Sequence, residues 1–124
     1  MLKGRALIVD DDYLGCRSLA RLLTRMGFDV REAGSAREAM DALRFAPADV
    51  VVSDYSMPVE DGVTLLSDVA RDFPESVRVF YSGTVPNARI KDALARGVAL
   101  RHFTKGDDLQ ALLNFLRELA PPAV

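Results

Sequence analysis

The sequence contains a single cysteine, no long apolar run and no excess of basic residues. Because Cys16 stands alone, no internal disulfide can form, and nothing points to an oxidising compartment. No apolar stretch reaches the roughly 18 residues that cross a bilayer, and no signal-peptide pattern opens the chain, so we expect no membrane contact and a cytoplasmic location. The net charge of −2 argues against direct nucleic acid binding, because domains with that function usually carry a basic stripe.

Internal linkers, repeats and low-complexity segments are also absent from the 124 residues, which favours one domain. Apolar residues make up 49% of the chain and charged residues 27%, as in ordinary globular proteins. A chain of this length buries about two-thirds of its unfolded surface. We expect one domain over residues 1–124 with a core over about 5–119, and residues 120–124 are expected to be a tail or the stub of a linker.

Strand and helix patterns alternate five times along the chain. The apolar and alternating runs predict strands over 5–9, 28–33, 49–53, 77–81 and 98–103, and the three- and four-residue spacings predict helices over about 13–26, 35–47, 62–73, 87–96 and 107–119. Asp12, Asp61 and Asp107 are expected to lie at helix N-termini, and Gly27 and Gly97 just past helix C-termini. Short connections between alternating elements favour an α/β fold with a parallel sheet covered by helices on both faces.

Polar side chains follow four of the five expected strands: Asp10 and Asp11, then Asp54, then Ser82 and Thr84, then Lys105. Parallel strands bring their carboxyl ends to one edge of the sheet, where open α/β sheets bind ligands. Each close pair of carboxylates there costs about 4 kcal/mol at an effective dielectric constant of about 20, and a hard cation such as Mg²⁺ relieves that repulsion. A carboxylate can also attack phosphorus, so Asp54 is the predicted nucleophile. Lys105 and Ser82 can bind phosphoryl oxygens.

With these residues in this order, the chain resembles the receiver domain of bacterial two-component response regulators over about residues 5–119. Four motifs carry the resemblance: Asp10-Asp11, the segment Asp54-x-x-Met57-Pro58-x-x-Asp61-Gly62, Ser82-Gly83, and Lys105. The resemblance implies a flavodoxin-like doubly wound sheet of five parallel strands in the order 2-1-3-4-5, with five helices. It implies a signalling phosphoprotein that catalyses only its own phosphorylation and dephosphorylation, and hence not an enzyme.

The resemblance also implies a role for each site residue. Asp54 would accept a phosphoryl group from a histidine kinase or a histidine phosphotransfer protein. Mg²⁺ or Mn²⁺ would be held by Asp11, Asp54 and the backbone carbonyl of Ser56, with Asp10 helping through water. Ser82 would be the switch hydroxyl, and Lys105 would pair with the phosphoryl group. The face formed by the fourth helix, fifth strand and fifth helix would then act on an output partner or an attached effector domain, and a phosphorylation-dependent dimer is compatible with this.

The sequence departs from the family pattern near Lys105. Gly106 stands where most receivers have a proline with a cis peptide bond, so we expect a trans bond and a looser loop. His102 replaces the usual tyrosine or phenylalanine, and a lone histidine on an edge strand is most often a solvated surface residue, with a modified switch or a partner contact as the alternative. Ser56 and Thr84 occupy positions that tune the loss of the phosphoryl group. Both are small, which predicts a lifetime of minutes.

Two alternatives remain open from the sequence. A haloacid-dehalogenase-like phosphatase would use Asp10-x-Asp12, Ser82 and Lys105-Gly106-Asp107, but it leaves the segment from Asp54 to Gly62 unexplained. A degenerate receiver would act as a phosphorylation-independent interaction module. The complete set of Asp11, Asp54, Ser82 and Lys105 argues against the degenerate receiver.

Overall fold

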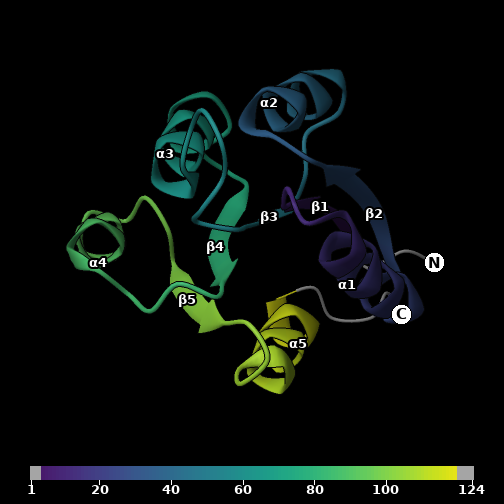
Figure 1. Cartoon of the computed structure of the whole chain (residues 1–124). Helices are drawn as coiled ribbons and strands as arrows, with labels where there is room; N and C mark the ends of the chain where they lie inside the picture. Colours follow the sequence, from purple (N-terminus) through teal and green to yellow (C-terminus); the bar gives the residue numbers. More distant parts are fainter. Residues whose placement is uncertain (1–3, 120–124) are drawn as a thin grey trace.

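The computed structural model describes residues 4–119, and its elements follow the expected alternation (Figure 1). The strands are β1 (Gly4–Val9), β2 (Phe28–Ala33), β3 (Val50–Ser53), β4 (Val77–Ser82) and β5 (Arg101–Thr104). The helices are α1 (Tyr13–Arg25), α2 (Ala36–Phe45), α3 (Gly62–Asp72), α4 (Ala88–Ala95) and α5 (Leu109–Leu119). No helix of this described part is both long and apolar enough to cross a membrane.

The five strands form one parallel sheet in the order β2-β1-β3-β4-β5. This confirms the predicted flavodoxin-like fold with five strands and five helices. The order places β1 and β3 inside the sheet, where both faces are covered. Residues 6–9 and 50–52 accordingly consist of apolar side chains that are at most 2% exposed, the pattern of strands buried on both faces.

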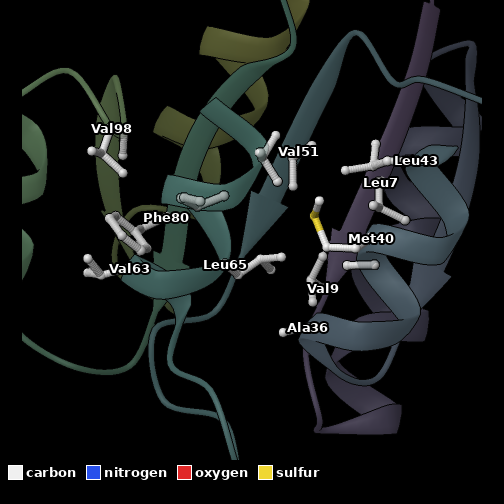
Figure 2. Close-up of a cluster of buried hydrophobic side chains, with 14 of the residues drawn as sticks. Leu7, Val9, Ala36, Met40, Leu43, Val51, Val63, Leu65, Phe80 and Val98 are labelled. Carbon is white, nitrogen blue, oxygen red and sulfur yellow. The ribbon is translucent and has the colours of Figure 1, made fainter. Parts of the chain in front are cut away.

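Two apolar clusters hold the helices against the sheet. Figure 1 shows α2, α3 and α4 on one face and α1 and α5 on the other. Alternate residues of each strand point to opposite faces. The first cluster therefore takes one set of strand residues and packs them against the first group of helices (Figure 2): Leu7, Val9, Val51 and Phe80 against Ala36, Met40, Leu43, Val63 and Leu65. The second packs Ile8, Val52, Val79 and Phe103 against Leu19, Leu23, Leu112 and Leu116.

The fifth strand begins three residues later than the sequence pattern predicts. Val98 and Ala99 are buried, but their amides donate to the Ala93 carbonyl of α4 at 2.9 and 3.4 Å. They therefore complete the end of α4 rather than extend the sheet. Pairing with β4 starts at Arg101, opposite Val79. An apolar run of this length does not distinguish a strand from a buried helix end.

Three aspartates predicted to lie at helix N-termini differ in their cap geometry. Asp61 is the N-cap of α3, and its carboxylate accepts the Thr64 amide at 2.9 Å. Asp12 occupies the N-cap position of α1 without a side-chain cap bond. The predicted role of Asp107 is wrong by one residue, because α5 begins at Leu109 and the first helical bond runs to the Asp108 carbonyl. The Asp108 carboxylate instead accepts the Thr104 amide at 2.8 Å, which closes the loop after β5.

Gly27 and Gly97 follow α1 and α4 with φ angles of 101° and 74°. Both have the left-handed conformation predicted for residues past a helix C-terminus. The predicted tail or linker stub, residues 120–124, lies outside the described residues.

Candidate functional site

Three carboxylates gather at the carboxyl edge of the sheet. Oxygen atoms of Asp10, Asp11 and Asp54 all lie within 4.8 Å of one another. Asp10 and Asp54 are 6% and 8% exposed, whereas Asp11 is exposed to solvent. The topology produces this cluster because β1 and β3 are adjacent parallel strands, so the residues that follow them meet at the same edge.

The backbone at Asp54 is fixed on both sides. Its amide donates to the Val9 carbonyl at 2.9 Å, which continues the sheet bonding past the end of β3. Its Oδ1 atom accepts the Tyr55 amide at 2.8 Å. The loop after Asp54 then closes at Gly62, whose amide donates to the Tyr55 carbonyl at 2.7 Å. The Asp54 Oδ2 atom faces Lys105, and the side chain is thereby held in one orientation at the rim of the sheet.

Lys105 lies between the two buried carboxylates. Its Nζ atom is 2.6 Å from Asp10 Oδ2 and 3.3 Å from Asp54 Oδ2. Burial alone would lower the pKa of Lys105, but the hydrogen bond that Lys105 donates to Asp10 and the charges of Asp54 and Asp10 outweigh it, so the pKa lies above its ordinary value. The lysine is therefore a fixed positive charge at the site at neutral pH.

Burial has the larger effect on Asp10. Desolvation raises the pKa of its carboxyl group above the ordinary value, although the contacts with Lys105 and with the Asp12 amide oppose the change. Asp10 Oδ1 accepts the Asp12 amide at 2.9 Å, and Oδ2 accepts Lys105. An ionised Asp10 therefore depends on nearby positive charge, which Lys105 supplies and which a bound cation would increase.

The predicted switch residues form a chain of contacts beside this cluster. Ser82 is fully buried, and its Oγ atom accepts the Thr84 amide at 3.1 Å. The Thr84 carbonyl lies 3.1 Å from Nε2 of His102, whose ring packs against Phe80 with the ring centroids 6.2 Å apart. His102 is half-buried. The solvated-surface interpretation of His102 is therefore wrong, since the side chain is bonded to the loop after β4.

Other predicted features concern the loops. The Lys105–Gly106 peptide bond is trans, as expected, and Gly106 has a φ angle of 83°. Ser56 is exposed in the loop two residues past Asp54, and Thr84 is half-buried in the loop past Ser82.

Cys16 is buried beneath the site, and desolvation raises the pKa of its thiol to about 12, so this cysteine is not a reactive thiolate.

One contact near the site was not predicted from the sequence. Arg89, in the first turn of α4, contacts Asp61 through Nε at 2.7 Å and through NH2 at 3.2 Å, and it also reaches Thr64 Oγ1 at 3.0 Å. Although burial opposes the change, the hydrogen bonds from Arg89 and from the Thr64 amide lower the pKa of Asp61. The loop after β3 is therefore tied to α4. No spacing rule connects residues 61 and 89, because they belong to different elements.

The donor set at the cluster is suited to a hard divalent cation. Carboxylate oxygens are the ligands that Mg²⁺ prefers, and it commonly takes one or two of them together with waters and phosphate oxygens. The cluster offers one oxygen atom from each of three carboxylates within 4.8 Å, and one of the three residues is open to solvent. The residues present therefore fit such an ion.

The fold and the acidic cluster define a class of doubly wound α/β domains with an acidic pocket at the carboxyl edge of the sheet. Residues 6–117 match the family model described as the response regulator receiver domain. The chain belongs to this family, whose members bind Mg²⁺ at an acidic cluster and act in signalling with kinases or phosphotransfer proteins and with output domains.

Among curated proteins, the chain is 39% identical over 98 residues to a protein-glutamate methylesterase/protein-glutamine glutaminase of Hahella chejuensis, an alignment that covers 75% of this chain and 25% of that protein. It is 32% identical over 111 residues to the transcriptional regulatory protein PdtaR of Mycobacterium tuberculosis, with 87% of this chain and 54% of that protein covered. The chain thus spans a quarter to about half of the length of these relatives.

Among solved structures, the signal receiver domain of an HD domain-containing protein from Pseudomonas fluorescens Pf-5 superposes with a TM-score of 0.85 at 28% identity. That alignment covers 94% of this chain and 85% of the other.

Neither alternative from the sequence is favoured. A degenerate receiver would lack part of the site, whereas Asp10, Asp11 and Asp54 lie together and Lys105 contacts two of them. A phosphatase of the dehalogenase type would need Asp12 beside Asp10, but the acidic cluster joins Asp10 to Asp11 and Asp54. Asp12 is exposed at the start of α1. The match to the receiver model over 6–117 also accounts for the segment from Asp54 to Gly62, which the phosphatase interpretation left unexplained.

Proposed function

We propose that this domain accepts a phosphoryl group on Asp54 and changes the surface formed by α4, β5 and α5 in response. The observation that carries the proposal is the position of Asp54. Its carboxylate lies at the carboxyl edge of the sheet, with two further carboxylates within 4.8 Å and a lysine ammonium 3.3 Å away. A nucleophilic oxygen, a cation site and a fixed positive charge are the groups that phosphoryl transfer requires.

The transfer exchanges one bond to phosphorus for another. An oxygen of Asp54 forms the new bond to phosphorus, and the bond from phosphorus to the donor breaks, with its electron pair leaving on the donor. For a phosphohistidine the leaving atom is a ring nitrogen, and for acetyl phosphate it is a carboxylate oxygen. Lys105 and the Ser82 hydroxyl bind oxygens of the transferred group. Hydrolysis later adds water to phosphorus and releases inorganic phosphate, which restores the Asp54 carboxylate.

Mg²⁺ or Mn²⁺ would be held by Asp11, Asp54 and the Ser56 carbonyl, with Asp10 acting through water. Bound there, the ion would supply positive charge that offsets the repulsion among the carboxylates and the charge of the transferred group. Asp10 and Lys105 hold each other in place at 2.6 Å, so Lys105 stays at the site to contact the incoming oxygens.

Magnesium is expected to raise the thermal stability of the protein. A ligand that binds only the folded state adds about 2.7 kcal/mol to the free energy of unfolding at a concentration of 100 times its Kd. The Mg²⁺-dependent rise in melting temperature should disappear in Asp11→Ala. The matched control is Asp12→Ala, which removes a neighbouring exposed acid outside the cluster and should keep the rise. An equal rise in both variants, measured by scanning fluorimetry with and without Mg²⁺, would contradict the metal assignment.

The switch would run through the contacts beside the cluster. Ser82 Oγ accepts the Thr84 amide, so a rotation of the Ser82 side chain that brings its hydroxyl to the phosphoryl group would draw Oγ away from this amide. A shift of Thr84 changes its carbonyl contact with His102 on β5. The loop between β4 and α4 and the exposed side of β5 would thus respond together, which shifts a two-state equilibrium of the α4–β5–α5 surface.

We propose that the phosphoryl donor is a histidine kinase or a histidine phosphotransfer protein. The domain would pass the signal to an output partner or to an attached effector domain. Family membership supports both assignments in general terms. Phosphorylation-dependent dimerisation is one form that the output would take. Direct nucleic acid or membrane binding is not part of the proposal, nor is any catalysis beyond self-phosphorylation and self-dephosphorylation. We also infer that the core of the domain spans about residues 5–119 and that the protein acts in the cytoplasm.

The phosphorylated form is expected to last for minutes. Ser56 and Thr84 are small side chains beside the site, and Ser56 is exposed, so water can approach phosphorus. The decay of the phosphorylated mass after rapid removal of the donor measures this lifetime. Replacing Thr84 with a bulkier residue should lengthen it. A wild-type phosphorylated form that persists through a day-long assay would contradict the prediction.

Incubation with acetyl phosphate and Mg²⁺ followed by intact-mass measurement tests the proposal as a whole. One added phosphoryl group on the wild type is the expected result. No added mass at any donor concentration would refute the assignment of Asp54.

A further inference from the structure

Hydrogen bonds to β4 and within the loop hold the backbone that carries Lys105. The Lys105 amide donates to the Ser82 carbonyl of β4 at 2.9 Å. The next residue, Gly106, is exposed, and a Cβ atom built there would meet no atom within 4 Å. The space on the side of a Cβ atom is therefore open, and hydrogen bonds hold the backbone of the loop.

One of these hydrogen bonds is accepted by a side chain of β4. The Gly106 amide donates to the Tyr81 hydroxyl at 3.3 Å. Tyr81 and Ser82 are consecutive residues of β4, so the last two residues of this strand bind two consecutive amides of the loop after β5. A proline at position 106 could not make the bond to Tyr81, because proline has no amide hydrogen.

The ring of Tyr81 is itself held in place. It is half-buried and packs against the apolar cluster between the sheet and helices α1 and α5. It also lines a cavity of about 200 Å³ that is shared with Asp54, Lys105 and Leu109. The ring is thus held in the core while its hydroxyl contacts the loop, and Tyr81 and Lys105 line the same cavity.

We propose that Tyr81 is a positioning residue. By holding the backbone of Gly106, it sets the position of the Lys105 side chain at the site. The inference rests on the proposed function, since it concerns how Lys105 meets the phosphoryl oxygens. Lys105 Nζ lies 2.6 Å from Asp10 and 3.3 Å from Asp54, so a small shift of the loop changes both contacts. Misplacement of a reacting group by about 1 Å can lower a rate substantially. The Tyr81 hydroxyl touches neither carboxylate and acts through the loop alone.

The experiment compares the full chain with Tyr81→Phe, which keeps the ring and removes the hydroxyl. Loss of a hydrogen bond of ordinary strength should speed hydrogen exchange of the Gly106 amide by roughly two- to tenfold. The rate of phosphorylation by acetyl phosphate with Mg²⁺ should fall by a similar factor. Tyr13→Phe is the matched control, because Tyr13 is 68% exposed and lies outside this loop, and it should change neither quantity.

A double-mutant cycle with Lys105→Met separates positioning from a general structural effect. If Tyr81 acts through the lysine, Tyr81→Phe should slow phosphorylation of the wild type but not of the Lys105→Met protein. An equal slowing in both backgrounds would overturn the inference, and so would an unchanged Gly106 exchange rate. A wild type that takes up no phosphoryl group would refute the proposed function and the inference with it, whereas a normal wild-type rate that Tyr81→Phe leaves unchanged would refute the inference alone.

Discussion

Asp54→Asn is expected to abolish phosphorylation of the domain. An amide lacks the anionic oxygen that attacks phosphorus, so the rate should fall by a factor on the order of 10³ or more, as when an enzyme loses its nucleophile. The asparagine oxygen can still accept the Tyr55 amide that Asp54 now accepts at 2.8 Å. The substitution also removes one charge from a cluster of three carboxylates. The variant should therefore fold, and its mass after incubation with acetyl phosphate and Mg²⁺ should equal that of the untreated protein.

Asp10→Asn is the matched control for this result. Asp10 is a buried carboxylate of the same cluster, and it is also the residue that a dehalogenase-type phosphatase would phosphorylate. We expect Asp10→Asn to be phosphorylated more slowly than the wild type, since it weakens both the cation site and the contact with Lys105. If Asp54→Asn were phosphorylated and Asp10→Asn were not, the nucleophile would be Asp10 and the assignment of Asp54 would be wrong.

The fold could be predicted from the sequence where an apolar pattern is compatible with only one kind of element. The valines of β3 and the apolar run of β1 are nearly fully buried, and such runs between turn residues indicate central strands of a parallel sheet. The start of β5 was not predictable in this way. Val98 and Ala99 are as apolar as strand residues, but their side chains pack in the first apolar cluster while their amides bond to the end of α4.

The site was likewise predictable only in part. Parallel strands fix the edge at which their carboxyl ends meet, so the meeting of Asp10, Asp11, Asp54 and Lys105 followed from the order of elements. Contacts between loops and side chains did not follow. The bonds of His102 to Thr84 and of Gly106 to Tyr81 depend on how far individual side chains reach between strands, and no sequence spacing encodes that distance.

Gly62→Ala is expected to destabilise the domain and displace the site. A Cβ atom at residue 62 would lie 2.2 Å from the Asp54 carbonyl oxygen and 2.9 Å from the Tyr55 Cα atom. Both are backbone atoms, and the Asp54 carbonyl is also held by the Ser53 hydroxyl at 2.8 Å, so they cannot rotate away as a side chain would. Overpacking of this kind costs about 1–3 kcal/mol in the free energy of unfolding.

Gly83→Ala is the control that isolates this close approach. A Cβ atom at residue 83 would meet no atom within 4 Å, and the residue does not have a positive φ angle. Alanine there should leave the free energy of unfolding within about 0.5 kcal/mol of the wild type, or raise it by restricting the unfolded chain. Urea unfolding of both variants measures the difference. Because the clash in Gly62→Ala involves the Asp54 carbonyl itself, the stability loss should be accompanied by slower phosphorylation under conditions where the variant is folded. Equal stability of the two variants would mean that the loop from Asp54 to Gly62 can move, and Asp54 could then not owe its orientation to that loop.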